Sequence, residues 1–284
     1  MKLIERIESE NPEKGSAHLW FLGGSSFVIK FHDQPVIFTD LDAYANLRGA
    51  DIPPSGLAPG IHIERRSFLP IDPHDISRPS AYVSSHEHND HCDKESLLAV
   101  VEKGGVLVGP RSSCDLAASW GVSREKIVKI DGERFEKTMF GSVEIYAAPG
   151  HDINAASSNI HLICYDGIRI LHNGDSLYDG PNYLTIADRF KKIDVALINL
   201  GKNSRGRHWY HTPYDVARAA NDLEPRFLIC HHYDKWDSLM EDPARVDEAI
   251  KTSYPEISER TKFVIVKNGE RFDVSSRETT STHA

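Results

Sequence analysis

The chain has 284 residues, of which 40% are hydrophobic and 26% are charged, and its formal net charge is −9. A chain of this length buries roughly three quarters of its unfolded surface, so it needs no disulfide or metal to fold. The acidic balance and the lack of a run rich in Lys and Arg exclude broad nucleic-acid binding. No apolar run approaches the roughly 20 residues of a membrane span, the four cysteines lack CxxC spacing, and no signal-peptide core is present. We therefore expect reduced thiols and a cytoplasmic location, with no membrane partner.

Short runs of β-type residues recur along the chain and predict strands. They lie at residues 18–22, 26–31, 36–40, 81–85, 106–109, 127–130, 143–148, 160–165, 168–173, 194–200, 226–231 and 263–266. Helical patterns are fewer, at residues 93–103, 111–120, 213–223 and 241–252, with Pro213 and Pro243 at first-turn positions. Because strands dominate the early part of each half and helices follow, the sequence predicts an α/β fold with two sheets faced by helices.

Two segments lack a regular pattern. Residues 42–79 are rich in Gly and Pro, and a loop this long inside a compact domain is usually functional or disordered. Its position just before a group of histidines favours a wall or lid of a site. The polar residues 275–284 are expected to form a flexible tail.

The segment after the run at 81–85 carries four candidate metal ligands. His86, His88, Asp90 and His91 lie within six residues, where a turn lets alternate side chains converge. Asp90 and His91 are adjacent and point in different directions, which suits ligands of a second, neighbouring ion better than four ligands of one. Imidazole and carboxylate together favour zinc, manganese or iron over copper or calcium. The alternative is a polar surface loop with incidental histidines.

The pattern His-x-His-x-Asp-His after a strand resembles the signature of the metallo-β-lactamase superfamily. Other ligand positions of that superfamily have counterparts in the same order, namely Asp40 after VIFT, His151 in APGHD, Asp175 in HNGDS, and His231 or His232 in LICHHYD. The resemblance implies an αβ/βα four-layer sandwich that forms a single hydrolase domain over residues 1–284. The metal site would lie at one edge, between the two sheets, with residues 42–79 as a loop insertion near it.

The same resemblance implies how the ligands divide between two divalent ions, Mn²⁺ or Zn²⁺. One ion would be held by His86, His88 and His151, the other by Asp90, His91 and His232, and Asp175 would bridge them. His231 stays the alternative to His232, because neighbours at the end of a strand project to opposite faces. Asp40 would orient a histidine through its second ring nitrogen, or else it caps a turn or helix.

The chain also resembles the L-ascorbate-6-phosphate lactonase-like branch of these metal-dependent hydrolases. The stretches WFLGGSSFVIKF, HNGDSLYDG, IDVALINLGKNSRG and HHYDKW carry this resemblance. The loop at residues 201–208 gathers basic side chains in an acidic chain, and Arg205 within it suits a phosphate or carboxylate. Asn203 would face the same anion or cap the turn. Four aromatic residues would line the pocket or simply pack within the protein, namely Tyr178, Tyr210, Tyr233 and Trp236.

We therefore expect a hydrolase in which a metal-bound hydroxide attacks the substrate, with Asp90 or Asp175 accepting a proton. The favoured substrate is a small anionic lactone, such as the lactone of a sugar-acid phosphate. A phosphodiesterase is the alternative, because both reactions pass through anionic transition states. A non-hydrolytic oxygen- or redox-active metal protein ranks last, since it would prefer a carboxylate where His88 stands. The metal and the oligomeric state stay open, a homo-oligomer included.

Overall fold

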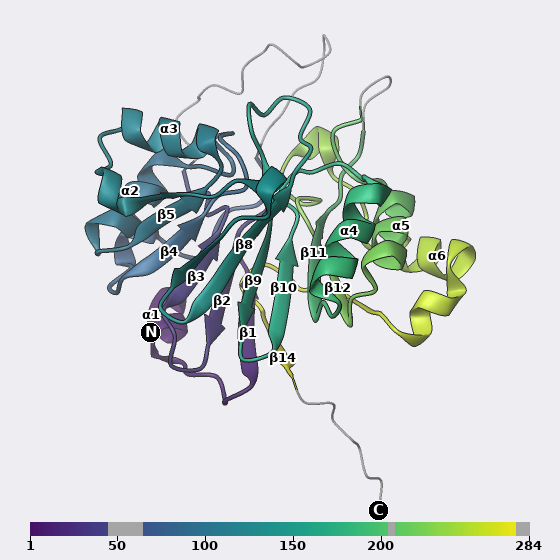
Figure 1. Ribbon diagram of the computed structural model, residues 1–284. Coiled ribbons are helices and arrows are strands. Elements are labelled where there is room, and N and C mark those ends of the chain that lie inside the picture. Colours follow the sequence, from purple (N-terminus) through teal and green to yellow (C-terminus); the bar gives the residue numbers. More distant parts are fainter. Residues whose placement is uncertain (45–64, 204–207, 277–284) are drawn as a thin grey trace, which may run out of the picture.

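Two β-sheets lie at the centre of the molecule, and the computed structural model describes residues 1–44, 65–203 and 208–276 (Figure 1). The strands of the first sheet are β1 (Ser16–Phe21), β2 (Phe27–Phe31), β3 (Val36–Thr39), β4 (Ser80–Val83), β5 (Val106–Gly109), β6 (Ile127–Lys129) and β14 (Arg271–Ser275). Their order is β14-β1-β2-β3-β4-β5-β6. The pairing changes from antiparallel to parallel at β3.

The second sheet follows the same plan. Its strands are β7 (Lys137–Phe140), β8 (Val143–Pro149), β9 (Asn159–Tyr165), β10 (Ile168–His172), β11 (Val195–Asn199), β12 (Phe227–His231) and β13 (Lys262–Val264). Their order is β13-β12-β11-β10-β9-β8-β7, and β10 to β13 run parallel to one another. Parallel strands end at the same edge of a sheet, so the loops after β10, β11 and β12 gather there.

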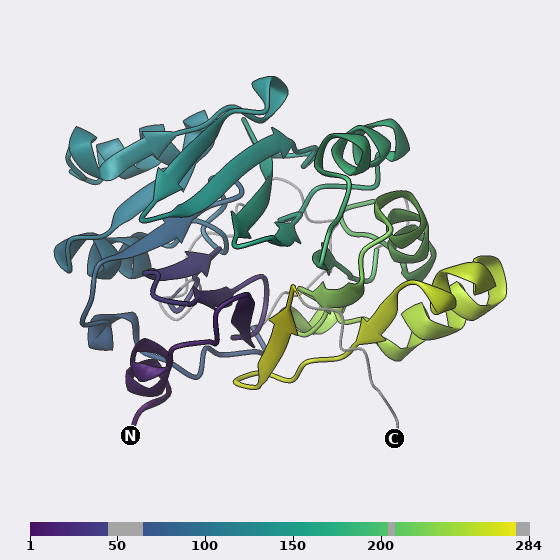
Figure 2. The same cartoon turned by 60° about the horizontal axis from the view of Figure 1, so that its bottom comes forward.

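Helices cover the outer face of each sheet. The first sheet carries α1 (Leu3–Ser9), α2 (Lys94–Glu102) and α3 (Arg111–Ser119), and the second carries α4 (Gly180–Phe190), α5 (Pro213–Leu223) and α6 (Ala244–Ser253). Short 3₁₀ turns lie at Pro73–Asp75, Arg124–Lys126, Gly132–Arg134, Asp237–Leu239 and Pro255–Glu259. In both Figure 1 and Figure 2 the strands lie between the two groups of helices. No helix in the described part is long and apolar enough to cross a membrane.

Strands that are buried on both faces separate three apolar layers. In β1, Leu19 and Phe21 face the core between the two sheets, whereas Trp20 belongs to the core under the helices of the first sheet. Successive side chains of a strand point to opposite faces, so each strand of this kind must be apolar almost throughout. The predicted αβ/βα four-layer sandwich is confirmed.

Some elements escaped the sequence patterns. Helices α1 and α4 and strands β7 and β14 were not predicted, and α4 begins with Gly180 and Pro181, which are typical of a loop. Its start is nevertheless encoded, because the side chain of Asp179 caps it by accepting from the amide of Asn182. Ser275 closes β14 opposite Ser16, so strand structure reaches into the predicted tail.

The predicted insertion at residues 42–79 is described only in part, since residues 45–64 lie outside the described ranges. Arg65 forms an isolated antiparallel bridge with Trp236, which connects the second described part of this insertion to the loop after β12. The four cysteines are free and buried, in agreement with the expectation of reduced thiols.

Candidate metal centre

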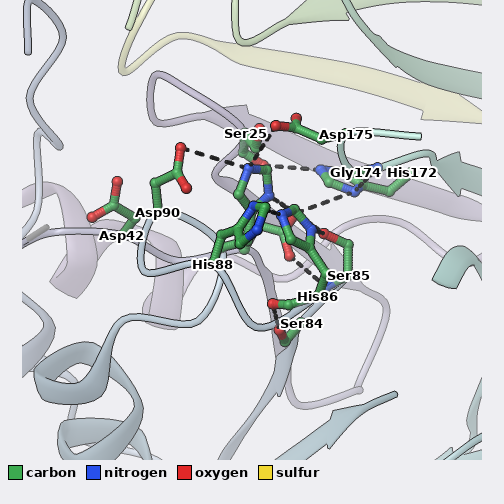
Figure 3. A network of polar contacts seen from close by, with 12 residues as sticks. Ser25, Asp42, Ser84, Ser85, His86, His88, Asp90, His172, Gly174 and Asp175 are labelled. Atoms are coloured by element: carbon green, nitrogen blue, oxygen red, sulfur yellow. Dashed lines mark hydrogen bonds and ion pairs between the residues drawn. The ribbon is translucent and has the colours of Figure 1, made fainter. Parts of the chain in front are cut away.

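The turn between β4 and α2 carries the histidine cluster predicted from the sequence. It closes by hydrogen bonds from the amides of His91 and Cys92 to the carbonyl of His88, at 2.8 and 2.7 Å. Asp93 then begins α2 by accepting from the amide of Ser96. Figure 3 shows His86, His88, Asp90 and Asp175 turned toward one another at this edge of the first sheet.

Three overlapping groups of ligand atoms form at this edge. In each group the atoms lie within 4.8 Å of one another, and the groups are His86, His91 and Asp175; His86, His88 and Asp152; and Asp90, His91 and His232. Every predicted metal ligand except His151 belongs to one of them. Each sheet contributes, because the turn after β4 extends from the first sheet whereas Asp152, Asp175 and His232 follow strands of the second.

The structure places Asp152 in the cluster, and it places the predicted ligand His151 outside these groups. Asp152 Oδ2 lies 3.2 Å from His86 Nε2 and 3.3 Å from His88 Nδ1. The side chain of His151 is 50% exposed, and its Nδ1 lies 2.8 Å from Asp179 Oδ2. Neighbouring side chains in an extended loop point in opposite directions, and the contact with Asp179 turns His151 outward. Sequence reasoning missed Asp152 because only the direction of its side chain distinguishes it from His151.

Asp175 reaches the cluster through a close approach of two loops. Gly174 has a left-handed φ of +55°, and a Cβ added there would lie 2.4 Å from the Cβ of Ser85. Glycine is therefore required for the loop after β10 to pass this close to the turn after β4. Asp175 Oδ2 lies 3.3 Å from His91 Nε2 and 3.5 Å from His232 Nε2. We call the group with Asp152 and the group with Asp90 the two outer ligand groups, and Asp175 lies between them.

His232, and not its neighbour His231, faces the cluster. His232 has a φ of 69°, which turns the chain at the end of β12, and its Nε2 lies 3.4 Å from Asp90 Oδ2. His231 points into a buried polar layer, where its ring stacks on His172 with centroids 4.8 Å apart. The alternation of side chains along a strand left both histidines as candidates, and the turn at His232 brings that residue to the cluster.

Asp40 lies behind the cluster and orients one of its histidines. His91 Nδ1 donates to Asp40 Oδ2 at 2.7 Å, and both the amide and the hydroxyl of Ser85 donate to the same carboxylate at 2.7 Å. This leaves Nε2 of His91 directed at the ligand groups. Burial opposes ionisation of Asp40, yet the charge and hydrogen bond of His91 hold its pKa at about 2.

Charges within the cluster keep its carboxylates ionised and one histidine basic. Although burial disfavours charge, His232 and His91 hold the pKa of Asp175 far below its ordinary value. Burial lowers the pKa of His91, but Asp175, Asp90 and Asp40 together raise it well above the ordinary range. Burial and the charge of Asp175 raise the pKa of Asp152 to about 6. Acidic and basic forms thus coexist within a few ångströms.

Buried ligand atoms without hydrogen-bond partners indicate that these residues fit a bound divalent ion. Several buried ligand atoms have no hydrogen-bond partner among the described residues, namely His91 Nε2, Asp152 Oδ2, Asp175 Oδ1 and His232 Nε2. Buried polar atoms almost always have a partner, so such a set needs an explanation. Imidazole nitrogens and carboxylate oxygens that converge without partners are what zinc, manganese or iron accepts as ligands.

The basic loop after β11 differs from its predicted role. The side chain of Asn203 accepts from the amides of Trp209 and Tyr210 at 2.7 and 3.0 Å and donates to the carbonyl of Tyr210 at 2.8 Å. These bonds close the loop, which is the arrangement expected if Asn203 caps the turn. Arg205 lies outside the described residues.

A buried cluster of charges beside Asp90 was not predicted. Lys235 is 1% exposed, and its Nζ lies 2.5 Å from Asp42 Oδ2 and 3.4 Å from Asp90 Oδ2. Arg65 Nη1 lies 3.2 Å from Asp42 Oδ1. The one signal in the sequence is the lysine within HHYDKW, three residues after a metal ligand. We call Asp42, Arg65 and Lys235 the charge cluster below.

A cavity lies beside Asp152. This cavity of about 690 Å³ is bordered by Asp152, Arg111 and Lys129 among others. Near it, Glu87 accepts from the hydroxyl of Ser112 at 2.6 Å and from the amide of Ala156 at 2.5 Å. Glu87 therefore ties the histidine turn to α3 and to the loop that carries Asp152.

A sandwich of two sheets with His and Asp ligands at its edge defines a metallo-hydrolase of the β-lactamase superfamily. A family model for the β-lactamase superfamily domain matches residues 57–233, more than half of the chain, and the chain belongs to this family. It is a metal-dependent hydrolase of that superfamily.

One curated protein and two solved structures are among the relatives that the chain resembles. The chain is 27% identical to the protein named "Probable L-ascorbate-6-phosphate lactonase UlaG" of Salmonella paratyphi B, over 86% of this chain and 77% of the relative. Igni18, a metallo hydrolase from Ignicoccus hospitalis, superposes with a TM-score of 0.66 at 15% identity, covering 92% of this chain and 99% of the other. CmlA, a diiron β-hydroxylase from Streptomyces venezuelae, superposes with a TM-score of 0.65 at 15% identity, covering 94% and 55%. These two structures are alike in fold.

Proposed function

We propose that the protein hydrolyses a small anionic lactone or a related ester with the help of two divalent ions. The observation that carries this proposal is the pair of outer ligand groups with Asp175 between them. One group is His86, His88 and Asp152, and the other is Asp90, His91 and His232. Two adjacent ions are a common device for hydrolysis at neutral pH.

The chemistry divides between the ions and the side chains. Bound ions would lower the pKa of a water toward neutrality and polarise the substrate oxygen. Asp90 and Asp175, whose pKa values both lie well below the ordinary value, are ionised at neutral pH and would orient that water by accepting its hydrogens. Asp40 keeps His91 in the tautomer that presents Nε2.

An anionic substrate is supported by the neighbouring cavity and by one relative. Arg111 and Lys129 border the cavity beside Asp152, and guanidinium and ammonium groups suit a phosphate or carboxylate. The similar Salmonella protein is named as a lactonase of a phosphorylated sugar acid. We therefore propose that the substrate is a lactone that carries an acidic group, and that the metal centre binds Mn²⁺ or Zn²⁺.

A second candidate function comes from the identity of one ligand. His86, His88 and Asp152 form a set of two histidines and one carboxylate, which in other proteins holds Fe²⁺ for oxygen chemistry. The fold is shared with CmlA, which is named as a diiron β-hydroxylase. An oxygen-active iron protein is therefore the alternative to the hydrolase.

Purified protein loaded separately with Zn²⁺, Mn²⁺ or Fe²⁺ tests the proposal. We expect turnover of a sugar-phosphate lactone, weaker turnover of a neutral γ-lactone, and little of bis-p-nitrophenyl phosphate, followed by chromatography of the products. Asp175→Ala should remove the activity. Preference for the phosphodiester would replace the lactonase with a phosphodiesterase, and oxygen consumption by the iron form without hydrolysis would favour the second candidate.

A further inference from the structure

His172 ends β10 three residues before the predicted ligand Asp175, and both of its ring nitrogens have partners. Its Nε2 lies 2.9 Å from the carbonyl oxygen of Ser25, in the turn between β1 and β2. Its Nδ1 lies 3.2 Å from the amide nitrogen of Gly174. A carbonyl can only accept and an amide N–H can only donate, so Nε2 carries the proton and Nδ1 accepts. The two neighbours therefore select one neutral tautomer of His172.

The bond to the amide of Gly174 acts on the direction of Asp175. Gly174 adopts the left-handed conformation that turns the chain between His172 and Asp175, and a glycine restricts its own backbone very little. Its carbonyl accepts from Nδ2 of Asn199 at 3.1 Å. The peptide groups on both sides of Gly174 are thereby fixed. The carboxylate that follows is then held with its Oδ2 3.3 Å from Nε2 of His91.

The turn between β1 and β2 gives His172 a firm support. In this turn the carbonyl of Gly24 accepts from the amide of His232 at 2.7 Å. The hydroxyl of Ser26 donates to the carbonyl of Asp40 at 2.6 Å. One turn of the first sheet is thus bonded to the residue behind the cluster and to a ligand from the second sheet. Through His172 it also reaches the loop after β10. Figure 3 shows the side of the cluster on which these contacts lie.

We propose that His172 is a positioning residue, which connects Ser25 to the amide of Gly174 and so sets the direction of the Asp175 carboxylate between the two outer ligand groups. The inference rests on the proposed two-ion centre. It makes a specific demand on the ring, because Nδ1 must accept from Gly174 while the proton on Nε2 serves only to hold the ring in place. Loss of a contact that orients a ligand typically lowers metal affinity by about 10–100-fold.

Two amide side chains separate the roles of the two ring nitrogens. The oxygen of asparagine stands near the place of Nδ1 and keeps the acceptor, whereas the nitrogen of glutamine stands near the place of Nε2 and keeps the donor. In His172→Gln the affinity for the more weakly bound of two Zn²⁺ ions should fall by about 10–100-fold, and in His172→Asn it should stay within about threefold of the wild type. Calorimetry against a competing chelator, well below the Tm of each protein, measures both.

His161→Gln is the matched control. His161 lies opposite His172 on the neighbouring strand β9 and is equally buried. Its Nε2 lies 2.9 Å from the carbonyl oxygen of Ser84, but no amide among the described residues donates to its Nδ1. The substitution therefore removes the same ring from the same layer without removing an acceptor in use. Its affinity for Zn²⁺ should stay within about threefold of the wild type.

Metal-free protein gives a second readout. Long-range proton–nitrogen NMR correlations of the wild type should place the ring proton of His172 on Nε2. The amide of Gly174 should exchange with solvent at least about tenfold faster in His172→Gln than in the wild type or in His172→Asn. If the role of the histidine were merely structural, the loss of Zn²⁺ affinity would follow the loss of Tm in all three variants.

The outcomes separate this inference from the proposal on which it rests. If the wild type binds two ions and His172→Gln binds them as tightly, the role of His172 is overturned and the two-ion centre stands. Equal losses of affinity in His172→Gln and His172→Asn, or a ring proton on Nδ1, would overturn it as well. Should His172→Gln fail to fold, the tautomer of the wild type and the affinity of His172→Asn still decide. If the wild type does not bind two ions, the two-ion centre and the role of His172 fail together.

Discussion

Asp152 gives the first ligand group a carboxylate between two imidazoles. His86 Nε2 and His88 Nδ1 lie 2.9 Å apart, and Asp152 Oδ2 is within 3.3 Å of both. With Asp90 and Asp175, the centre then contains three carboxylates. Oxygen ligands shift the preference of a site toward harder ions such as manganese. One residue therefore influences which metal is selected.

Replacing Asp152 and His151 one at a time tests which of them is the ligand. Asp152→Ala is expected to lose about one of two bound ions, because it removes an oxygen from the first group, whereas His151→Ala should keep both. Elemental analysis of protein dialysed against a limiting metal concentration measures this. Loss of an ion in His151→Ala with retention in Asp152→Ala would restore the ligand set implied by the sequence.

Sequence patterns reveal a ligand when its neighbours in the chain determine its direction. His86, His88, Asp90 and His91 share one turn, so their spacing alone brings them together. Asp152 is different, because the loop after β8 is irregular and the contact between His151 and Asp179 decides which side chain turns inward. Local spacing contains no information about that contact.

At the scale of elements, the charge cluster fixes the loop after β12 to the loop after β3. Lys235 approaches the carboxylates of both Asp42 and Asp90 and donates to the carbonyl of Asp90 at 3.1 Å. A charge this deeply buried is tolerated only when it is paired. The cluster thereby holds two loops and a metal ligand in one arrangement. Its partners are far apart in the chain, so no local pattern predicts it.

Lys235→Met should destabilise the protein, because it keeps the volume of the side chain but removes the ammonium group from Asp90 and leaves Asp42 with Arg65 alone. The free energy of unfolding is expected to fall by roughly 3 kcal/mol, measured by urea denaturation. The exposed Lys267→Met serves as the control and should change it by less than about 0.5 kcal/mol. Adding Asp42→Asn to Lys235→Met should recover part of the loss, and purely additive effects would show that the two residues are not coupled.

Across the whole molecule, buried histidines connect stability to pH. His211 is fully buried between Asn199 and Tyr183, with its Nδ1 2.5 Å from Asn199 Oδ1. Burial lowers the pKa of His211 to about 4, and burial also lowers the pKa of His161 and His172. Between the folded pKa and the ordinary unfolded value of about 6.5, the unfolded chain binds more protons. Stability due to His211 is therefore present above pH 6.5 and is lost as the pH falls toward 4.

His211→Gln isolates one such contribution, since glutamine does not titrate. Between pH 7 and pH 5 the wild type should lose about 2 kcal/mol more unfolding free energy than the variant. Denaturant unfolding of both proteins at each pH measures the difference, and metal release at low pH affects both alike. Parallel pH profiles would mean that His211 is not buried in its neutral form.

Glu87 has a consequence for moving this centre into another protein. The signature His-x-His-x-Asp-His leaves its position unspecified, yet Glu87 joins the histidine turn to Ser112 of α3 and to Ala156 in the loop of Asp152. A designer who grafts only the ligands onto a similar scaffold would leave that loop unattached. Glu87 must therefore be transferred with the ligands, together with Ser112 and the backbone at Ala156 that it binds.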